Sequence, residues 1–231
     1  MTQNEPGKRR LVIVGDSSFA EVAFEMFDAG ERYNVVAFAV HAAFRKRESL
    51  FERPVLTIEG LTEKCPPETH DAFVALTYRE LNRARTRLCA EMKAKGYRLA
   101  TFVSERAFVW RNVPIGENTF IFENNVVQPF CEIGNNVILW SGNHIGHHSV
   151  IEDNAFLASQ IVVSGHCRVG RNSFIGVNAT LADQVTLGPD NWIGPGSLIT
   201  KDTPAGSMYR EEDTVISRVA AKRFFRVKSD D

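Results

Sequence analysis

The sequence has little of what marks several common classes of protein. Lys and Arg (27) nearly balance Asp and Glu (28) over 231 residues, for a formal net charge of −1. Without a basic excess, neither nucleic acid nor an anionic membrane is expected as a main partner. No apolar run approaches the ~20 residues of a membrane-spanning helix. The polar first ten residues lack the apolar core of a secretory signal, so we expect a cytoplasmic protein.

Cysteine is also scarce, with four residues: Cys65, Cys89, Cys131 and Cys167. Their spacing is neither that of a zinc site nor that of a disulfide framework. Two of them, Cys131 and Cys167, fall on inward positions of the repeat described next. We therefore expect packed core thiols and no resident metal.

What the sequence does have is a repeat of six residues in its second half. Neither an α-helix nor a simple strand has this period, and a fixed short repeat indicates units that stack on one another. Four residues after each aliphatic position comes a small or medium side chain, and glycine often follows the aliphatic. The aliphatic positions are Val103, Val109, Ile115, Ile121, Val127, Ile133, Leu139, Ile145, Ile151, Leu157, Val163, Val169, Ile175, Leu181, Leu187, Ile193 and Ile199.

This spacing predicts a parallel β-helix. The aliphatic residue and the small residue two positions before the next aliphatic are an even step apart, so both can point to one side of a short strand. The residues between them form a corner, where Gly or Asn accepts a positive φ at little cost. Three strands and three corners close a triangular coil of about 18 residues, and successive coils pair roughly 4.8 Å apart.

The first hundred residues predict a small parallel α/β domain, because apolar strands alternate with helices. Ser18 with Glu21, and Thr77 with Glu80, fit capping boxes for two helices that end near Gly30 and Gly96. The turn at residues 15–18 lies where such folds hold phosphate groups, although a tight turn needs its glycine in any case. The expected strands are Leu11–Val14, Val35–Val40 and Asp71–Leu76.

The hexad pattern, over about residues 101–204, resembles that of the hexapeptide-repeat, left-handed β-helix acyltransferases. An α/β domain directly before such a β-helix resembles the sugar acyltransferases that include sialic-acid O-acetyltransferases and bacillosamine and perosamine N-acetyltransferases. The resemblance implies a nucleotide-sugar-binding domain (1–100), a β-helix acyltransferase domain (101–204) and a C-terminal helical tail (205–231). It also implies acetyl-CoA as co-substrate, a nucleotide-linked sugar for surface polysaccharide such as lipopolysaccharide O-antigen, and a homotrimer with sites between subunits.

The resemblance also implies roles for residues of the first domain. The family's phosphate loop usually reads Gly-Ala-Ser/Gly-Gly-His-Gly, and here Gly15, Asp16 and Ser17 stand at its start. Asp16 would repel a diphosphate but could bond a ribose or a base. His41, just after the second strand, falls where the family contacts its nucleotide.

The densest chemical run is Asn-His-Ile-Gly-His-His-Ser at residues 143–149. A histidine in this Ile-x-His context is the family's general base, which implies that role for His147; an imidazole with an ordinary pKa of about 6.5 suits it. One coil on, Gly165 would offer its N–H to the thioester carbonyl. Where the family usually follows the base with Glu or Asp, His148 stands here. Either His148 relays charge, or Glu152 or Asp153 replaces the acid.

By the same resemblance, Phe156, Val177 and Pro195 line the arm of CoA. Residues 211–227 are compatible with a helix that caps the open end of the β-helix or contacts the 3′-phosphate of CoA.

Two other functions fit the repeat. A zinc hydrolyase of the γ-carbonic-anhydrase type would use His144, His148 and His166 as ligands. A non-enzymatic β-helix scaffold would need no histidine at a corner. The sequence leaves open N- or O-transfer, the sugar, its carbon and nucleotide, and the length of the acyl group.

Overall fold

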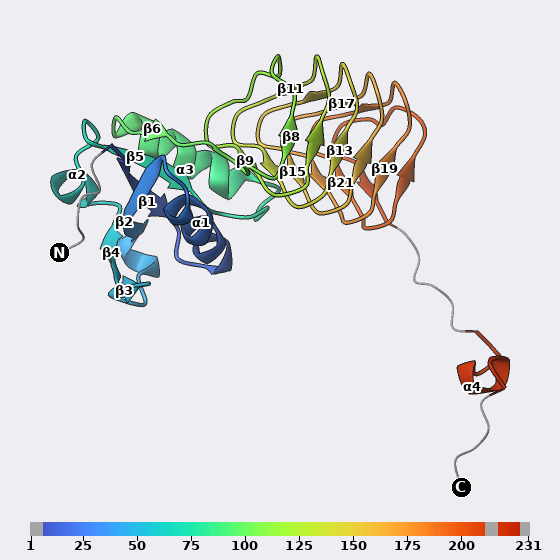
Figure 1. Cartoon of the computed structure of the whole chain (residues 1–231), viewed down its shortest axis with the longest axis horizontal. Coiled ribbons are helices and arrows are strands. Elements are labelled where there is room, and N and C mark those ends of the chain that lie inside the picture. Colours follow the sequence, from blue (N-terminus) through green and yellow to red (C-terminus); the bar gives the residue numbers. More distant parts are fainter. Residues whose placement is uncertain (1–6, 211–216, 227–231) are drawn as a thin grey trace, which may run out of the picture.

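The computed structural model describes residues 7–210 and 217–226, which form an α/β domain followed by a long β-helix (Figure 1). The two parts expected from the sequence are both present. In the described part of the chain, no helix has the length and apolar character that crossing a membrane requires.

The α/β domain is built on one six-stranded sheet with β1 near its centre. The strand order is β3-β4-β2-β1-β5-β6, and all pairs are parallel except β3 with β4. Because β1 lies between β2 and β5, the chain reverses its direction of winding at the carboxyl end of β1. The elements are β1 (Arg9–Val14), α1 (Ser18–Ala29), β2 (Tyr33–Val40), a 3-10 turn (Ala42–Phe44), β3 (Ser49–Leu50), β4 (Arg53–Thr57), α2 (Leu61–Lys64), β5 (His70–Val74), α3 (Arg83–Ala94) and β6 (Arg98–Leu99).

Both predicted capping boxes are wrong. Helix α1 begins at Ser18 itself, so Ser17 is the N-cap, and its hydroxyl makes no capping bond. Helix α3 begins at Arg83, six residues after Thr77. Before it the chain turns through three residues with positive φ, from Glu80 to Asn82. Contacts with the β-helix hold this turn, and these tertiary contacts override the local helix signal.

The β-helix has three faces, each a parallel sheet of two-residue strands. The first face consists of β7 (Phe102–Val103), β9 (Phe120–Ile121), β12 (Ile138–Leu139), β15 (Phe156–Leu157), β18 (Phe174–Ile175), β21 (Trp192–Ile193) and β23 (Met208–Tyr209). The second face consists of β8 (Phe108–Val109), β10 (Val126–Val127), β13 (His144–Ile145), β16 (Val162–Val163), β19 (Thr180–Leu181) and β22 (Leu198–Ile199). The third face consists of β11 (Glu132–Ile133), β14 (Val150–Ile151), β17 (Arg168–Val169) and β20 (Thr186–Leu187).

Partners on a face stand 18 residues apart, as Val126, His144 and Val162 do. From Ile121 to Ile199 the aliphatic residue of every hexad is at most 5% exposed, which confirms the predicted interior. Cys131 and Cys167 belong to the same buried cluster. The hexad therefore predicted correctly which side chains fill the prism from Ile121 onward, whereas Val103 is 37% exposed and Val109 and Ile115 are half-buried in the first coil.

Each corner of the prism is a column of residues with positive φ. We call the corner between the third and first faces the Asn column; it contains Asn118, Asn136, Asn154, Asn172 and Asp190. The corner between the second and third faces is the His column; it contains Phe130, His148, His166 and Gln184. The remaining corner, between the first and second faces, contains Asn124, Gly142, Gln160, Asn178 and Gly196.

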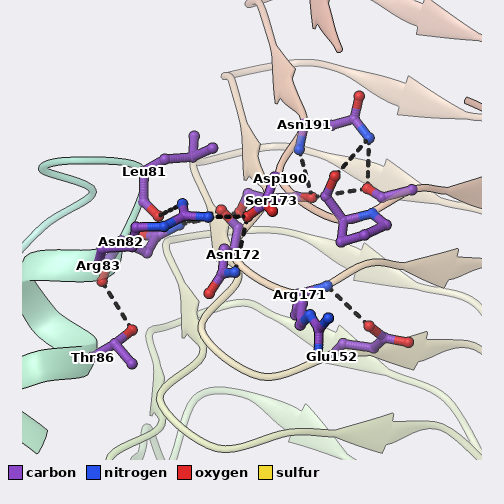
Figure 2. A network of polar contacts seen from close by, with 12 residues as sticks. Leu81, Asn82, Arg83, Thr86, Glu152, Arg171, Asn172, Ser173, Asp190 and Asn191 are labelled. Atoms are coloured by element: carbon purple, nitrogen blue, oxygen red, sulfur yellow. Dashed lines mark hydrogen bonds and ion pairs between the residues drawn. The ribbon is translucent and has the colours of Figure 1, made fainter. Parts of the chain in front are cut away.

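The α/β domain packs on the first face of the β-helix. Phe19 meets Phe120 at 5.3 Å and Trp140 at 5.5 Å between ring centroids. Figure 2 shows polar contacts at the same junction, where the Asn82 side chain donates to the Asn172 carbonyl at 2.9 Å. The two parts thus share one buried cluster.

Arg85 of α3 is fully buried at this junction. It donates to the Asn136 side-chain oxygen (2.8 Å) and carbonyl (3.0 Å), and also to the carbonyls of Thr77 and Asn154 at 3.1 and 3.4 Å. Among the described residues, none of its acceptors is a carboxylate. Burial lowers the pKa of Arg85 to about 10. A cation held only by amide and carbonyl oxygens fastens the α/β domain to the Asn column.

Of the predicted helix at 211–227, residues 211–216 and 227 lie outside the described residues. Within the described residues 217–226 only α4 (Ala221–Phe224) is helical, so the predicted helix is wrong over 217–220, and all of these residues are exposed.

Candidate active site

His147 stands at the exposed corner that follows β13. Its backbone N–H donates to the Gln128 side-chain oxygen at 2.9 Å, and its carbonyl accepts the His166 N–H at 2.9 Å. The corner is therefore held from the coil before and from the coil after, while the imidazole itself stays in solvent.

The imidazole of His147 lies over Gly165, as the 18-residue coil predicted. A Cβ on Gly165 would lie 2.9 Å from Cε1 and 3.2 Å from Nε2 of His147, so only glycine leaves room for the ring. The same point is 3.1 Å from Oδ1 of Asp183, one coil further on. In the described part of the chain the Gly165 N–H has no acceptor. Nε2 of His147 (3.2 Å) and Oδ1 of Asp183 (3.1 Å) thus lie close to the same point beside Gly165.

His148, which stands where an acid was expected from the sequence, contacts the imidazole of His147. Its Nδ1 lies 3.1 Å from Nδ1 of His147, so one of the two nitrogens donates and the other accepts. For Nε2 of His147 to accept a proton, its Nδ1 must carry the hydrogen and His148 must be the acceptor. The ring of His148 is stacked between Phe130 and His166, each at 4.8 Å between centroids.

Neither carboxylate considered as a substitute acid contacts these histidines. Glu152 pairs with Arg168 and accepts the Arg171 N–H at 3.0 Å. Asp153 accepts the Asn135 N–H at 2.7 Å, on the side of the Asn column. The carboxylate near the base is Asp183, which sequence reasoning missed. Its spacing of 18 residues from Gly165 is the signal that could have found it.

The predicted CoA-arm residues fall into two places. Val177 and Pro195 are exposed at the corner between the first and second faces, on consecutive coils. Phe156 is 3% exposed on the first face, against Tyr78 at 5.1 Å and Phe174 at 5.6 Å. The structure brings the first pair together and puts Phe156 under the α/β domain.

The predicted nucleotide loop lies at the carboxyl end of β1, beside the reversal in strand order where α/β sheets bind ligands. Gly15 has φ +127°, and a Cβ there would lie 2.9 Å from the Ala75 carbonyl oxygen. The turn thus needs this glycine for its own geometry. Ser17 is exposed at the start of α1 and its hydroxyl makes no capping bond, and Asp16 lies 3.7 Å from the Arg47 guanidinium.

His41, at the end of β2, lies between two carboxylates. Its Nδ1 is 3.0 Å from Glu59 and its Nε2 is 3.1 Å from Glu91 of α3. A backbone hydrogen bond within Glu59 and the bond from His41 lower the pKa of Glu59. Both ring nitrogens of His41 are thus engaged at the carboxyl edge of the sheet, next to β1, which ends at Val14.

The histidine set of the zinc hydrolyase alternative does not come together. His144 lies on the second face, whereas the described histidines that converge are His147, His148 and His166.

Comparisons with known proteins agree with this fold. Residues 112–147 match the family model for the bacterial transferase hexapeptide (six repeats). The acetyltransferase domain of PglB from Neisseria gonorrhoeae, solved in complex with acetyl coenzyme A, is 25% identical. The match covers 87% of this chain and 96% of that one, with a TM-score of 0.78. No curated protein matches the sequence.

Two further solved structures share the fold. PerB from Caulobacter crescentus, in complex with CoA and GDP-perosamine, is 24% identical over 88% of this chain and 94% of that one, with a TM-score of 0.77. WeeI from Acinetobacter baumannii is 18% identical over 87% and 96%, with a TM-score of 0.73. This chain carries the hexapeptide repeat of bacterial transferases and shares the fold of the PglB acetyltransferase domain along most of its length.

Proposed function

We propose that this protein transfers an acetyl group from acetyl-CoA to an amino or hydroxyl group of a nucleotide-linked sugar. The observation that carries the proposal is the placement of the His147 imidazole over Gly165. His147 takes the proton from the sugar amine or hydroxyl through Nε2 as that atom attacks the thioester carbon. Gly165 donates its N–H to the carbonyl oxygen where negative charge develops. The carbon–sulfur bond then breaks, and the proton held by His147 passes to the CoA sulfur.

His148 completes the base in this proposal. As the acceptor at Nδ1 of His147, it keeps the lone pair on Nε2, where the substrate is expected. A carboxylate in that position would also stabilise the positive charge that His147 gains; a neutral imidazole does so less. Asp183 is the carboxylate available to offset that charge from the other side of Gly165.

A homotrimer with sites between subunits is part of the same proposal. The α/β domain covers the first face, while His147 stands beside the His column, the corner opposite that face. A sugar held by the α/β domain of one chain is therefore on the wrong side of the prism for the base of that chain. The second face, next to the His column, exposes apolar side chains at Phe108, Val162 and Leu198, which suits contact with a neighbour.

The remaining roles follow from this arrangement. Gly15, Asp16, Ser17 and His41 would contact the nucleotide at the carboxyl edge of the sheet. Val177 and Pro195 would line the CoA arm, whereas Phe156 is buried under the α/β domain and is not part of that surface. We assign residues 1–100 to nucleotide-sugar binding, 101–204 to acetyl transfer and 205–231 to a C-terminal tail. A cytoplasmic role in lipopolysaccharide or other surface-polysaccharide synthesis fits a nucleotide-linked substrate.

The test measures turnover and binding separately. The protein is incubated with acetyl-CoA and a panel of GDP-, UDP- and dTDP-linked aminosugars, and acetylated sugar is detected by mass spectrometry. We expect turnover with at least one sugar, and a fall in kcat of about 10²–10⁴ in His147→Asn. Acetyl-CoA should raise the Tm of both proteins, because the base is not needed for binding.

His144→Gln is the matched control, since it removes a neighbouring imidazole outside the site, and it should keep wild-type kcat. Full activity in His147→Asn would rule out the proposed role. Absence of any acetyl-CoA effect on Tm together with no turnover would favour a scaffold.

A further inference from the structure

Three imidazoles converge at the proposed active corner although the fold requires none of them. His147, His148 and His166 each offer a ring nitrogen, and these atoms all lie within 4.8 Å of one another. Two come from adjacent positions of one turn, and the third comes from the next coil. The other two corner columns have the same positive φ at Asn, Asp, Gln and Gly residues.

We propose that these three side chains form a binding site for Zn²⁺. Three histidines with an open fourth position are a common zinc ligand set. With Zn–N bonds of 2.0–2.1 Å, ligand atoms of a tetrahedral site are about 3.3 Å apart. The Nδ1 atoms of His147 and His148, at 3.1 Å, already have this spacing. All three side chains are exposed, so a rotation of the His166 ring closes the remaining gap without disturbing the core.

Zinc at this site would switch off acetyl transfer without covering the substrate, an effect that rests on the proposed function. Coordination through Nδ1 of His147 leaves the ring hydrogen on Nε2. The nitrogen that faces Gly165 then has no lone pair with which to accept a proton. Asp183, on that side of Gly165, can accept the Nε2 hydrogen and so support the bound form. The same imidazole cannot be base and ligand at once.

Direct binding is the primary test. The full-length protein, stripped of metal by a chelator, is titrated with Zn²⁺ in competition with a chromophoric chelator. We expect one zinc per chain, and an affinity at least about tenfold lower in His166→Asn. Asn keeps the left-handed backbone of the corner, as it does in the Asn column, and circular dichroism with Tm confirms the fold. His144→Gln, outside the cluster, should bind zinc like the wild type.

The activity measurement separates this inference from the proposed function. His166→Asn should keep wild-type kcat in the absence of metal, but should need at least about tenfold more zinc for inhibition. If the wild type binds no zinc, or if His166→Asn binds it as tightly, the metal site is refuted whatever the acetyl transfer. If zinc binds as expected but no sugar is acetylated, the metal site stands and the proposed function fails.

Discussion

The Asn column and the His column share one backbone and differ in their side chains. Asn136 has φ +56° and His148 has φ +60°, and each stands 18 residues from the next member of its column. The amide of Asn136 bonds Asn118 and Asn154 above and below it, and the α/β domain covers that corner. The rings of His148 and His166 stack in solvent. The backbone of a corner thus requires only a residue that tolerates positive φ. The side chains determine the role: the Asn column forms the joint with the α/β domain, and the His column forms the candidate active site.

The largest effect is expected from replacing Arg85, which should lower the stability of the joint between the α/β domain and the Asn column. In Arg85→Met the carbonyl oxygen of buried Asn136 loses the Arg85 donor, and its side-chain oxygen loses one of its donors. We expect this to cost about 3 kcal/mol of unfolding free energy. For a chain of this length we expect a fall in Tm of about 10 °C. Thermal unfolding measures it. Arg87→Met is the control on the same helix. Among the described residues this exposed side chain pairs only with Glu80, so Tm should hardly move. Equal losses in the two variants would contradict the fastening role.

The next largest effect is expected from replacing Gly165, which should lower the activity of the candidate active site. In Gly165→Ala the new Cβ would meet the His147 ring at 2.9 Å and push it out of line. Because small misplacements of a base are costly, we expect kcat to fall about 10²-fold with little change in Tm. Steady-state kinetics beside thermal unfolding distinguishes this outcome from Arg85→Met, which should lower Tm but leave His147 in place. A fully active Gly165→Ala would show that the base does not act over this glycine.

A smaller effect is expected from the partner of the base. His148→Gly removes the acceptor at Nδ1 of His147 and keeps the left-handed backbone, because glycine accepts positive φ. We expect kcat to fall about tenfold while the KM for acetyl-CoA stays unchanged. Asn154→Gly makes the equivalent change in the Asn column, and there the loss should be in Tm and not in kcat. A loss of Tm alone in His148→Gly, or a loss of kcat alone in Asn154→Gly, would contradict the different roles of the two columns.

The smallest effect is expected from removing the hydrogen bond between Gln128 and the His147 backbone. Gln128→Met removes the acceptor of the His147 backbone N–H but leaves both imidazoles. Since one exposed hydrogen bond is worth about 1 kcal/mol or less, kcat should fall only a few-fold. The kcat values of Gln128→Met and His148→Gly, measured under the same conditions, show whether the first loss is the smaller. A larger loss in Gln128→Met would mean that the backbone, more than the imidazole pair, positions the base.

The sequence predicted the β-helix more fully than the α/β domain, for a physical reason. In the β-helix the neighbours of a residue stand 18 positions away, so spacing alone placed Gly165 beside His147 and Cys131 in the core. The start of α3 depends on Asn82, whose partners on the β-helix lie 90 and 91 residues away, and no local pattern contains them. Arg85 was missed for the same reason, since its acceptors on the β-helix are oxygens of ordinary turn residues. Asp183 was within reach of the repeat and was overlooked.

The 18-residue coil also limits how such a protein can change in length. Loss of six residues within the β-helix would move every later side chain to the next face, and the joint with the α/β domain would meet the wrong corner. Loss or gain of one whole coil leaves every face as it was. His147 and Gly165 stand on consecutive coils, so even a whole coil cannot be added between them. Relatives of this chain are therefore expected to vary in length by multiples of eighteen residues, and always outside the pair.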